Sequence, residues 1–268
     1  MNIIKTVQEL RAFREPLWLE GKTLSFVPTM GALHEGHLKL VEEGQKSADI
    51  CLPYIFLNPT QFAEGEDLDA YPKTLDEDVA RLESLGVTHL YAPTVEEVYP
   101  SGFQIVRVSS PDQPLEGEYR PHFFDGVCTV VLKMLMQCSP DIALFGEKDF
   151  QQLQVIKDMV KELNIPVEVK AVETVRDDNG LALSSRNQYL SEDEYQIAIY
   201  LNQILKQMVA NQISEDEAIK SLLDKGFGKV DYCTYRNSDT FLPDDPNRVL
   251  AAAWIGTTRL IDNMAMVE

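Results

Sequence analysis

The fold is decided by one stretch of the sequence, Thr23-Leu-Ser-Phe-Val-Pro-Thr-Met-Gly-Ala-Leu-His-Glu-Gly-His37. Its first five residues form an apolar run that predicts a strand, and apolar residues at helical spacing follow from Leu38 to Ala48. Between the two stand two of the chain's four histidines, His34 and His37, near the expected start of the helix. A strand, a glycine-bearing turn and a helix in this order predict a βα unit of a parallel sheet.

The same alternation continues through the first two thirds of the chain. Further strands are expected at 50–57, 88–91, 142–145 and 167–175, and helices at 75–85, 127–136 and 150–163. After Arg186 the pattern changes to helices at 192–209 and 215–223 and strands at 230–235 and 249–253. We therefore expect an α/β domain with a parallel sheet, residues 1–182, followed by a smaller α+β domain, residues 183–268.

Composition and charge narrow the class of protein. With 268 residues, 44% of them hydrophobic, the chain can build one large core or two modest ones. No window approaches the roughly 18–20 apolar residues of a membrane span, and the N-terminus lacks a signal-peptide pattern. The four cysteines show no C-x-x-C spacing, which favours free thiols in a reducing compartment and hence a cytoplasmic location.

The formal net charge of −19 argues against nucleic-acid binding, because a phosphate backbone is bound by neutralising it with Lys and Arg. A pocket that concentrates positive charge can still bind a small anion. The acidic segment Glu64–Asp69 is typical of a solvated loop, and a magnesium role for it stays open as an alternative.

The opening stretch has the features of an anion site. Gly31 permits a tight turn, and the helix start offers unpaired backbone N–H groups at the positive end of the helix dipole. His34 and His37 would add donors toward phosphate oxygens, with Gly36 leaving room for a base or ribose. The alternative is that both histidines only cap the helix or lie on the surface, because H-x-G-H recurs by chance.

Three further polar clusters stand where expected strands end. They are Asn58-Pro-Thr-Gln-Phe62, Gly146-Glu-Lys-Asp149 and Leu183-Ser-Ser-Arg186. Because the carboxyl ends of parallel strands share one rim, we expect convergence on the His34/His37 loop of the following side chains: Gln61, Lys148, Gln152, Ser184, Ser185 and Arg186. Each also has a plain alternative: Gln152 facing solvent, the serine pair capping a helix, and Lys148 pairing with Glu147 or Asp149.

Together these residues resemble the pantothenate synthetase (pantoate–β-alanine ligase) family. The matching segments are 28–37, 56–62, 65–72, 145–153, 180–187 and 256–263. The resemblance implies a cytoplasmic homodimer whose first domain is a Rossmann-like sheet of the nucleotidylyltransferase and class I aminoacyl-tRNA synthetase superfamily. The smaller domain would close over the ATP site. The implied reaction joins pantoate to β-alanine through a pantoyl adenylate, cleaving ATP to AMP and pyrophosphate with Mg²⁺.

The resemblance also implies roles for single residues. His37 would be the proton-donating catalytic residue, with His34, Lys148 and Arg186 acting on the phosphates. Gln61 and Gln152, together with Asn58, would hold pantoate and β-alanine, and no metal ligand is singled out. The ATP site would comprise Met30, Gly31, Ala32, Leu33, His34, Glu35, Gly36, His37, Gly146, Glu147, Lys148, Asp149, Val175, Leu183, Ser184, Ser185 and Arg186.

The chemistry fits these residue types. A carboxylate with a pKa of about 4 is already ionised at neutral pH, so the first step needs charge neutralisation and positioning instead of a base. The β-alanine ammonium must lose a proton before the second step, and the sequence singles out no base for it. The mixed anhydride must be shielded from water, and segments 62–72 and 116–125 are the expected lid.

Two positions depart from the family pattern, and three rival functions remain. Phe123 stands, after His122, where the family usually has histidine, and Asn179 stands where Asp is common. The rivals are another H-x-G-H nucleotidylyltransferase with a different small acceptor, a non-catalytic nucleotide-binding protein, and nucleotide transfer onto tRNA or DNA. The Asn58 and Gln152 clusters favour an unphosphorylated acceptor, because a phosphate would call for more Lys or Arg there.

Overall fold

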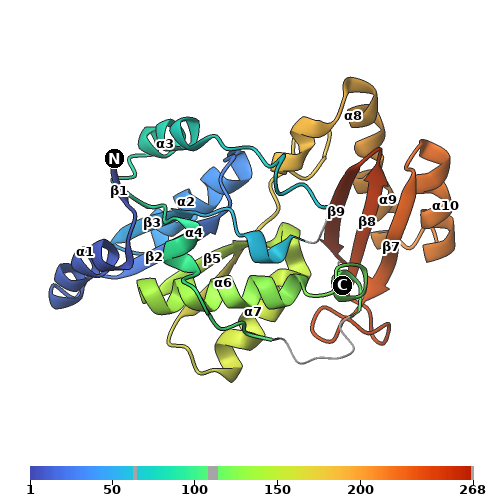
Figure 1. Cartoon of the computed structure of the whole chain (residues 1–268). Helices are drawn as coiled ribbons and strands as arrows, with labels where there is room; N and C mark the ends of the chain where they lie inside the picture. The colour runs from blue at the N-terminus through green and yellow to red at the C-terminus, as the bar shows by residue number, and fades with distance from the viewer. Residues whose placement is uncertain (63–64, 108–113, 267–268) are drawn as a thin grey trace. The chain divides into compact units, whose positions relative to one another are not determined.

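The computed structural model describes residues 1–62, 65–107 and 114–266. The chain divides into two compact units (Figure 1). The first holds the described residues up to 107 together with Arg120–Glu147 and Gln151–Glu173. The second holds the chain from Thr174 onward and two short pieces of the preceding sequence, residues 114–119 and Lys148–Phe150. The expected boundary between residues 182 and 183 stays a prediction.

The first unit is built on a six-stranded parallel sheet, as expected from the sequence. The strand order is β1-β4-β3-β2-β5-β6. The strands are β1 (Asn2–Ile4), β2 (Leu24–Thr29), β3 (Ile50–Ile55), β4 (His89–Tyr91), β5 (Ile142–Gly146) and β6 (Glu168–Val172). The order reverses at β2, which lies between β3 and β5, and the carboxyl end of such a switch point is where parallel sheets bind ligands.

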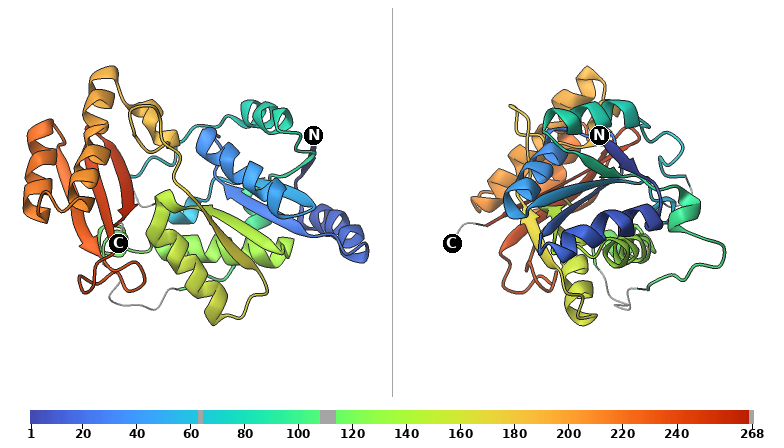
Figure 2. Two further views of the ribbon diagram at one scale, coloured as in Figure 1. Left: turned by 180° about the vertical axis from the view of Figure 1, so that it is seen from behind. Right: turned by 90° about the vertical axis from the view of Figure 1, so that its left-hand side faces the viewer.

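Helices cover both faces of this sheet (Figure 2). On one face lie α2 (Glu35–Ser47) and α3 (Leu75–Ser84), and on the other lie α1 (Val7–Leu19), α6 (Phe123–Cys138) and α7 (Phe150–Glu162). Because side chains alternate along a strand, Phe26 packs against the second set of helices and its neighbour Val27 against the first. The first strand and α1 were not expected from the sequence.

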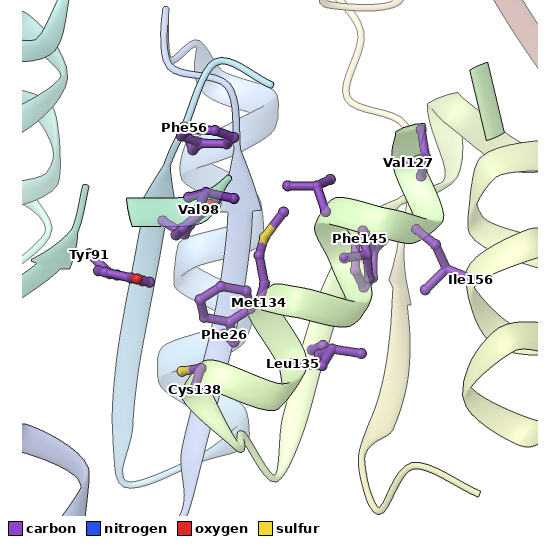
Figure 3. Close-up of a cluster of buried hydrophobic side chains, with 14 of the residues drawn as sticks. Phe26, Phe56, Tyr91, Val98, Val127, Met134, Leu135, Cys138, Phe145 and Ile156 are labelled. Atoms are coloured by element: carbon purple, nitrogen blue, oxygen red, sulfur yellow. The ribbon is translucent and has the colours of Figure 1, made fainter. Parts of the chain in front are cut away.

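Each face of the parallel sheet carries a hydrophobic cluster, and the larger of these two clusters lies under α6 (Figure 3). Phe26 and Phe145 project from neighbouring strands toward Val127, Met134 and Leu135 of that helix. This apolar layer fixes the positions of β2 and β5. The candidate residues that follow β2 and β5 therefore start from a rigid support.

The second unit contains an antiparallel sheet in the order β7-β8-β9. Its elements are α5 (Glu116–Tyr119), η3 (Ser185–Tyr189), α8 (Glu192–Ala198), α9 (Tyr200–Val209), α10 (Glu215–Lys225), β7 (Lys229–Arg236), β8 (Arg248–Ile255) and β9 (Thr258–Ala265). One face packs on α9 and α10 through Val249 and Ala251, and the other receives Leu250 against Phe150. The prediction of a single helix at 192–209 is wrong, because the helix is interrupted at Ile199, between α8 and α9.

Local sequence signals define several helix starts. Thr6 with Glu9, and Ser214 with Glu217, form capping boxes at α1 and α10. The first unit also contains the short elements α4 (Val95–Val98) and η1 (Pro59–Gln61). Among the described residues, none of the helices has the length and apolar character needed to cross a membrane.

Candidate active site

The chain turns sharply where β2 ends. Thr29 donates from its hydroxyl to the carbonyl of Tyr54 at 2.8 Å and accepts the N–H of Gly31 at 3.3 Å. Gly31 has φ +83°, and a Cβ there would lie 3.2 Å from Oδ2 of Asp78 and 3.3 Å from Cγ2 of Ile55. Only glycine meets both conditions without strain, so the turn brings the backbone close to α3.

A buried carboxylate holds the next two residues. Asp78 on α3 is 1% exposed. Its Oδ2 accepts the N–H of Ala32 at 3.0 Å and its Oδ1 the N–H of Leu33 at 2.7 Å, while Thr74 donates its hydroxyl at 3.2 Å. Ala32 has φ +50°, a conformation that costs a residue with a Cβ about 1 kcal/mol or more. The carboxylate therefore holds the turn in a strained shape.

The two histidines stack at the start of α2. His34 is the N-cap residue, and its Nδ1 accepts the N–H of Gly36 at 3.1 Å. His37 reciprocates, because its Nδ1 accepts the N–H of His34 at 3.4 Å, and the ring centroids lie 4.0 Å apart. Since each Nδ1 accepts a hydrogen bond, the proton of each neutral ring lies on Nε2. The expected helix start is confirmed. The capping alternative accounts for the Nδ1 atom of each ring, and it leaves the Nε2 atoms without an assigned role.

A second polar loop follows β3. Asn58 is 1% exposed, and its amide donates to Oε1 of Gln61 at 3.0 Å. The Oδ1 of Asn58 accepts the hydroxyl of Tyr99 at 2.6 Å and that of Thr60 at 2.9 Å. Burial raises the pKa of Tyr99 above its ordinary value, so the phenol remains a donor. Gln61 in turn donates to Sδ of Met30 at 3.2 Å, which joins this loop to the end of β2.

The N-terminal end of α6 presses directly on this loop. A Cβ on Gly126 would lie 2.3 Å from the carbonyl oxygen of Thr60, a distance that a real Cβ does not tolerate. The carbonyl of Gly126 accepts the Asn58 amide at 3.3 Å. Asn58 therefore joins η1 to α6 and fixes the side chain of Gln61.

Arg120 connects the two segments expected to form a lid. Its guanidinium donates to Glu66 at 2.9 and 2.7 Å and to the carbonyl of Gln61 at 3.2 Å. The guanidinium carbon also lies 3.8 Å from the ring centroid of Phe123, the residue that departs from the family pattern. Glu66 of the acidic segment thus pairs with an arginine, while Glu64 lies outside the described residues.

In the second unit a hairpin presents the Leu183–Arg186 segment. Leu183 donates its N–H to the carbonyl of Val175 at 2.9 Å, and Arg176 bridges to Ala182. Ser184 is the N-cap residue of η3 and accepts the N–H of Arg186 at 3.3 Å, so the helix-cap alternative holds for this serine. Lys148 lies in η2 (Glu147–Asp149) with its Nζ 3.9 Å from Oδ2 of Asp149.

The candidate residues are divided between the two units. The first carries Met30–His37, Asn58, Gln61, Gly146, Glu147 and, in the first turn of α7, Gln152. The second carries Lys148, Asp149, Val175 and Leu183–Arg186. Contacts join Met30 with Gln61, and His34 with His37. The convergence of both sets on one ligand stays a prediction.

Sequence reasoning missed the residues that hold these loops. Asp78 follows Asp76 and Glu77 at the start of α3, where an acidic run is typical of a solvated first turn. Its signal is its place one turn after Thr74, on the side of α3 that is buried. Tyr99 gave no signal beyond its aromatic character.

The site can be compared with known proteins. A family model for pantoate–β-alanine ligase matches residues 2–265. The chain belongs to the pantoate–β-alanine ligase family. Among family relatives, the pantothenate synthetase of Hyphomonas neptunium is 47% identical over 100% of this chain and 97% of its own length. That of Mesorhizobium japonicum is 45% identical over 98% and 97%, respectively.

Solved structures of the family share the fold. Pantothenate synthetase from Thermus thermophilus has a TM-score of 0.91 with 40% sequence identity and covers 100% of both chains. The pantoate–β-alanine ligase of Francisella tularensis, complexed with β-γ ATP and β-alanine, has a TM-score of 0.89 with 35% identity and covers 99% of this chain and 98% of that one. The parallel sheet and the small antiparallel sheet are thus family features.

Proposed function

We propose that the chain joins pantoate to β-alanine with ATP, through a pantoyl adenylate, releasing AMP and pyrophosphate. The observation that carries the proposal is the stacked histidine pair at the N-terminus of α2, at the switch point of the parallel sheet. Helix N-termini bind phosphate through backbone N–H groups and the helix dipole. The protons on the two Nε2 atoms add donors to the same end of the helix.

In the first step a pantoate carboxylate attacks the α-phosphorus of ATP, the bond to the bridging oxygen breaks, and pyrophosphate leaves. Both reactants are anions, so the barrier is lowered by positioning and by donors aimed at the phosphoryl oxygens. His37 donates to the oxygen that gains charge, and Lys148 and Arg186 neutralise the phosphates. Gln61 and Gln152 hold pantoate, and the fixed amide of Gln61 supports this role because its Oε1 and Nε2 have set partners in Asn58 and Met30.

Magnesium fits as a companion of the nucleotide. Among residues 1–62, 65–107 and 114–266, no group of three or more His, Cys, Asp or Glu side chains could hold a metal ion. Mg²⁺ is commonly bound by one or two carboxylates together with substrate phosphates, so it needs no complete protein site. When bound there it would neutralise phosphate charge.

In the second step the amine of β-alanine attacks the acyl adenylate and AMP leaves. The intermediate must be kept from water, and we assign this to segments 62–72 and 116–125. The Arg120–Glu66 pair supports the assignment, because it joins one residue of each segment, and both of these residues belong to the first unit. Protection of these segments from proteolysis by ATP plus pantoate is expected, and unchanged cleavage would remove them from this role.

We also propose a cytoplasmic homodimer. All four cysteines, Cys51, Cys128, Cys138 and Cys233, are free thiols, which suits a reducing compartment. Light scattering of the purified chain tests the dimer, and a monomer at working concentration would refute it.

The function is tested by AMP release from ATP and Mg²⁺, omitting pantoate and β-alanine in turn, with mass spectrometry of the products. Pantothenate and AMP should appear together only when both acceptors are present. ATP cleavage at the same rate with and without pantoate would favour the alternative, an H-x-G-H nucleotidylyltransferase with another acceptor.

The role of His37 is tested by two isosteric variants. His37→Asn keeps an acceptor near Nδ1 and so keeps the bond from the His34 N–H, but it lacks a donor at the Nε2 position. His37→Gln places a donor near Nε2. We expect turnover to fall about 100-fold or more in His37→Asn and less in His37→Gln, as for loss of a general acid. Equal activity of His37→Asn and the unmodified chain would leave His37 a capping residue only.

A further inference from the structure

We propose that two adjacent residues of β9, Asp262 and Asn263, are positioning residues that fix the backbones carrying Lys148 and Arg186. The inference rests on the proposed function, because it concerns how the expected ATP-binding segments of the second unit are held. Both residues belong to the matching segment 256–263, for which neither the sequence nor the proposed mechanism supplies a role. Asp262 is 3% exposed and Asn263 is 5% exposed.

Asn263 holds the Lys148 turn. Its amide Nδ2 donates to the backbone carbonyl of Lys148 at 3.0 Å. Its Oδ1 accepts from the guanidinium of Arg248, and that guanidinium lies 3.7 Å over the ring of Phe150. Phe150 packs in turn on Phe241, with ring centroids 6.0 Å apart. Residues Lys148–Phe150 therefore belong to the second unit, and Asn263 supplies a direct hydrogen bond between them and β9.

Asp262 holds the hairpin that leads to Arg186. Its carboxylate accepts two hydrogen bonds from the guanidinium of Arg176, at 2.7 and 2.8 Å. The same guanidinium donates to the carbonyls of Gly180 and Asn263, at 3.2 and 3.3 Å. Arg176 thus ties the closed end of the 175–183 hairpin to the strand. The residues that follow this hairpin are the expected phosphate-binding ones.

The pleat of β9 explains how neighbours serve two segments. Successive side chains of a strand point to opposite faces. Asp262 pairs with Ala251, which packs in the cluster that contains Leu181 of the hairpin. Asn263 pairs with Leu250, which packs with Phe150 beside Lys148. One strand therefore sets the hairpin from one face and the Lys148 turn from the other, and β9 also contacts η3 directly.

A double-mutant cycle tests the Asn263 half. Asn263→Asp replaces the side-chain NH2 group with an oxygen. It keeps the oxygen that accepts from Arg248 and removes the donor to the Lys148 carbonyl. We expect kcat/KM for ATP to fall about tenfold, the scale of one lost buried hydrogen bond with an oxygen left facing an oxygen. In a Lys148→Ala background the same change should cost less than about twofold, because coupled residues are non-additive.

The Asp262 half has the complementary pattern. Asp262→Asn should lower kcat/KM for ATP about tenfold alone and should add little to Arg186→Ala. In a Lys148→Ala background, Asp262→Asn should still lower kcat/KM for ATP by the full tenfold or so, because the two faces of β9 serve different segments. Additivity in every background would show general structural damage and overturn the proposal.

The control and the readouts separate the possible failures. Asn237→Asp also removes an amide donor to a backbone carbonyl of the second unit, that of Asp245 at 3.3 Å, and should leave turnover unchanged. If the unmodified chain makes no pantothenate, the proposed function fails, and calorimetric ATP binding by the same variants then decides the inference. If Asn263→Asp does not fold, Asn263→Ala enters the cycle. Unchanged ATP binding and turnover in both halves would refute the positioning role.

Discussion

The two units hold their candidate loops with buried aspartates in different ways. In the first unit Asp78 bonds the backbone of the loop itself, through the N–H groups of Ala32 and Leu33. In the second unit Asp262 holds its hairpin through the guanidinium of Arg176. The first arrangement is direct and short, while the second passes through an arginine side chain.

The difference lies in charge and in reach. The contacts described for Asp78 are with neutral donors, namely two amides and the hydroxyl of Thr74, and a buried carboxylate needs such donors. Asp262 is paired with a cation whose side chain is 22% exposed, so that cation can be hydrated if its partner is lost. Substitution of Asp78 should therefore lower stability and activity more than substitution of Asp262.

The largest effect is expected for Asp78→Asn. An amide in this position turns one acceptor into a donor that faces the loop N–H groups. Loss of a charged buried acceptor costs about 3 kcal/mol. If the loop shifts accordingly, kcat/KM for ATP should fall about 100-fold, since about 1.4 kcal/mol corresponds to tenfold. Steady-state AMP release and urea unfolding measure both effects.

Asp76→Asn is the matched control for this change. Asp76 lies on the same helix and is exposed, so its neutralisation should alter unfolding by less than about 0.5 kcal/mol. Equal behaviour of the two variants would end the distinction drawn for Asp78.

A smaller effect is expected for Arg176→Lys. Lysine keeps the positive charge but loses the planar fork that bonds both oxygens of Asp262 and the carbonyl of Gly180. We expect kcat/KM for ATP to fall about tenfold, the scale of one to two lost hydrogen bonds to a charged partner. Full activity of Arg176→Lys, measured by AMP release, would mean that charge alone holds the hairpin.

Much of this arrangement could be predicted from the sequence, because it depends on local patterns. The βα rhythm, the helix start at Glu35 and the polar strand ends follow from periodicity and turn residues. What could not be predicted depends on tertiary contacts. Asp78 lies in an acidic run that is typical of a solvated helix start. Strand β9 was missed because Arg259, Asp262 and Asn263 interrupt its apolar pattern, and the partners that let these polar side chains lie in the strand come from distant parts of the sequence. The break at Ile199 carries no Gly or Pro signal.

The smallest effect is expected for Glu66→Gln. The Arg120–Glu66 pair also relays through an arginine, but its carboxylate side chain is 26% exposed, against 2% for Asp262. Partly exposed ion pairs contribute about 1 kcal/mol or less and weaken with salt. Urea unfolding should therefore show a small loss at low salt that shrinks in about 1 M NaCl, where the screening length is ~3 Å. Asp262→Asn should show a larger loss that salt leaves nearly unchanged. If both losses responded equally to salt, burial would not be what separates the two relays.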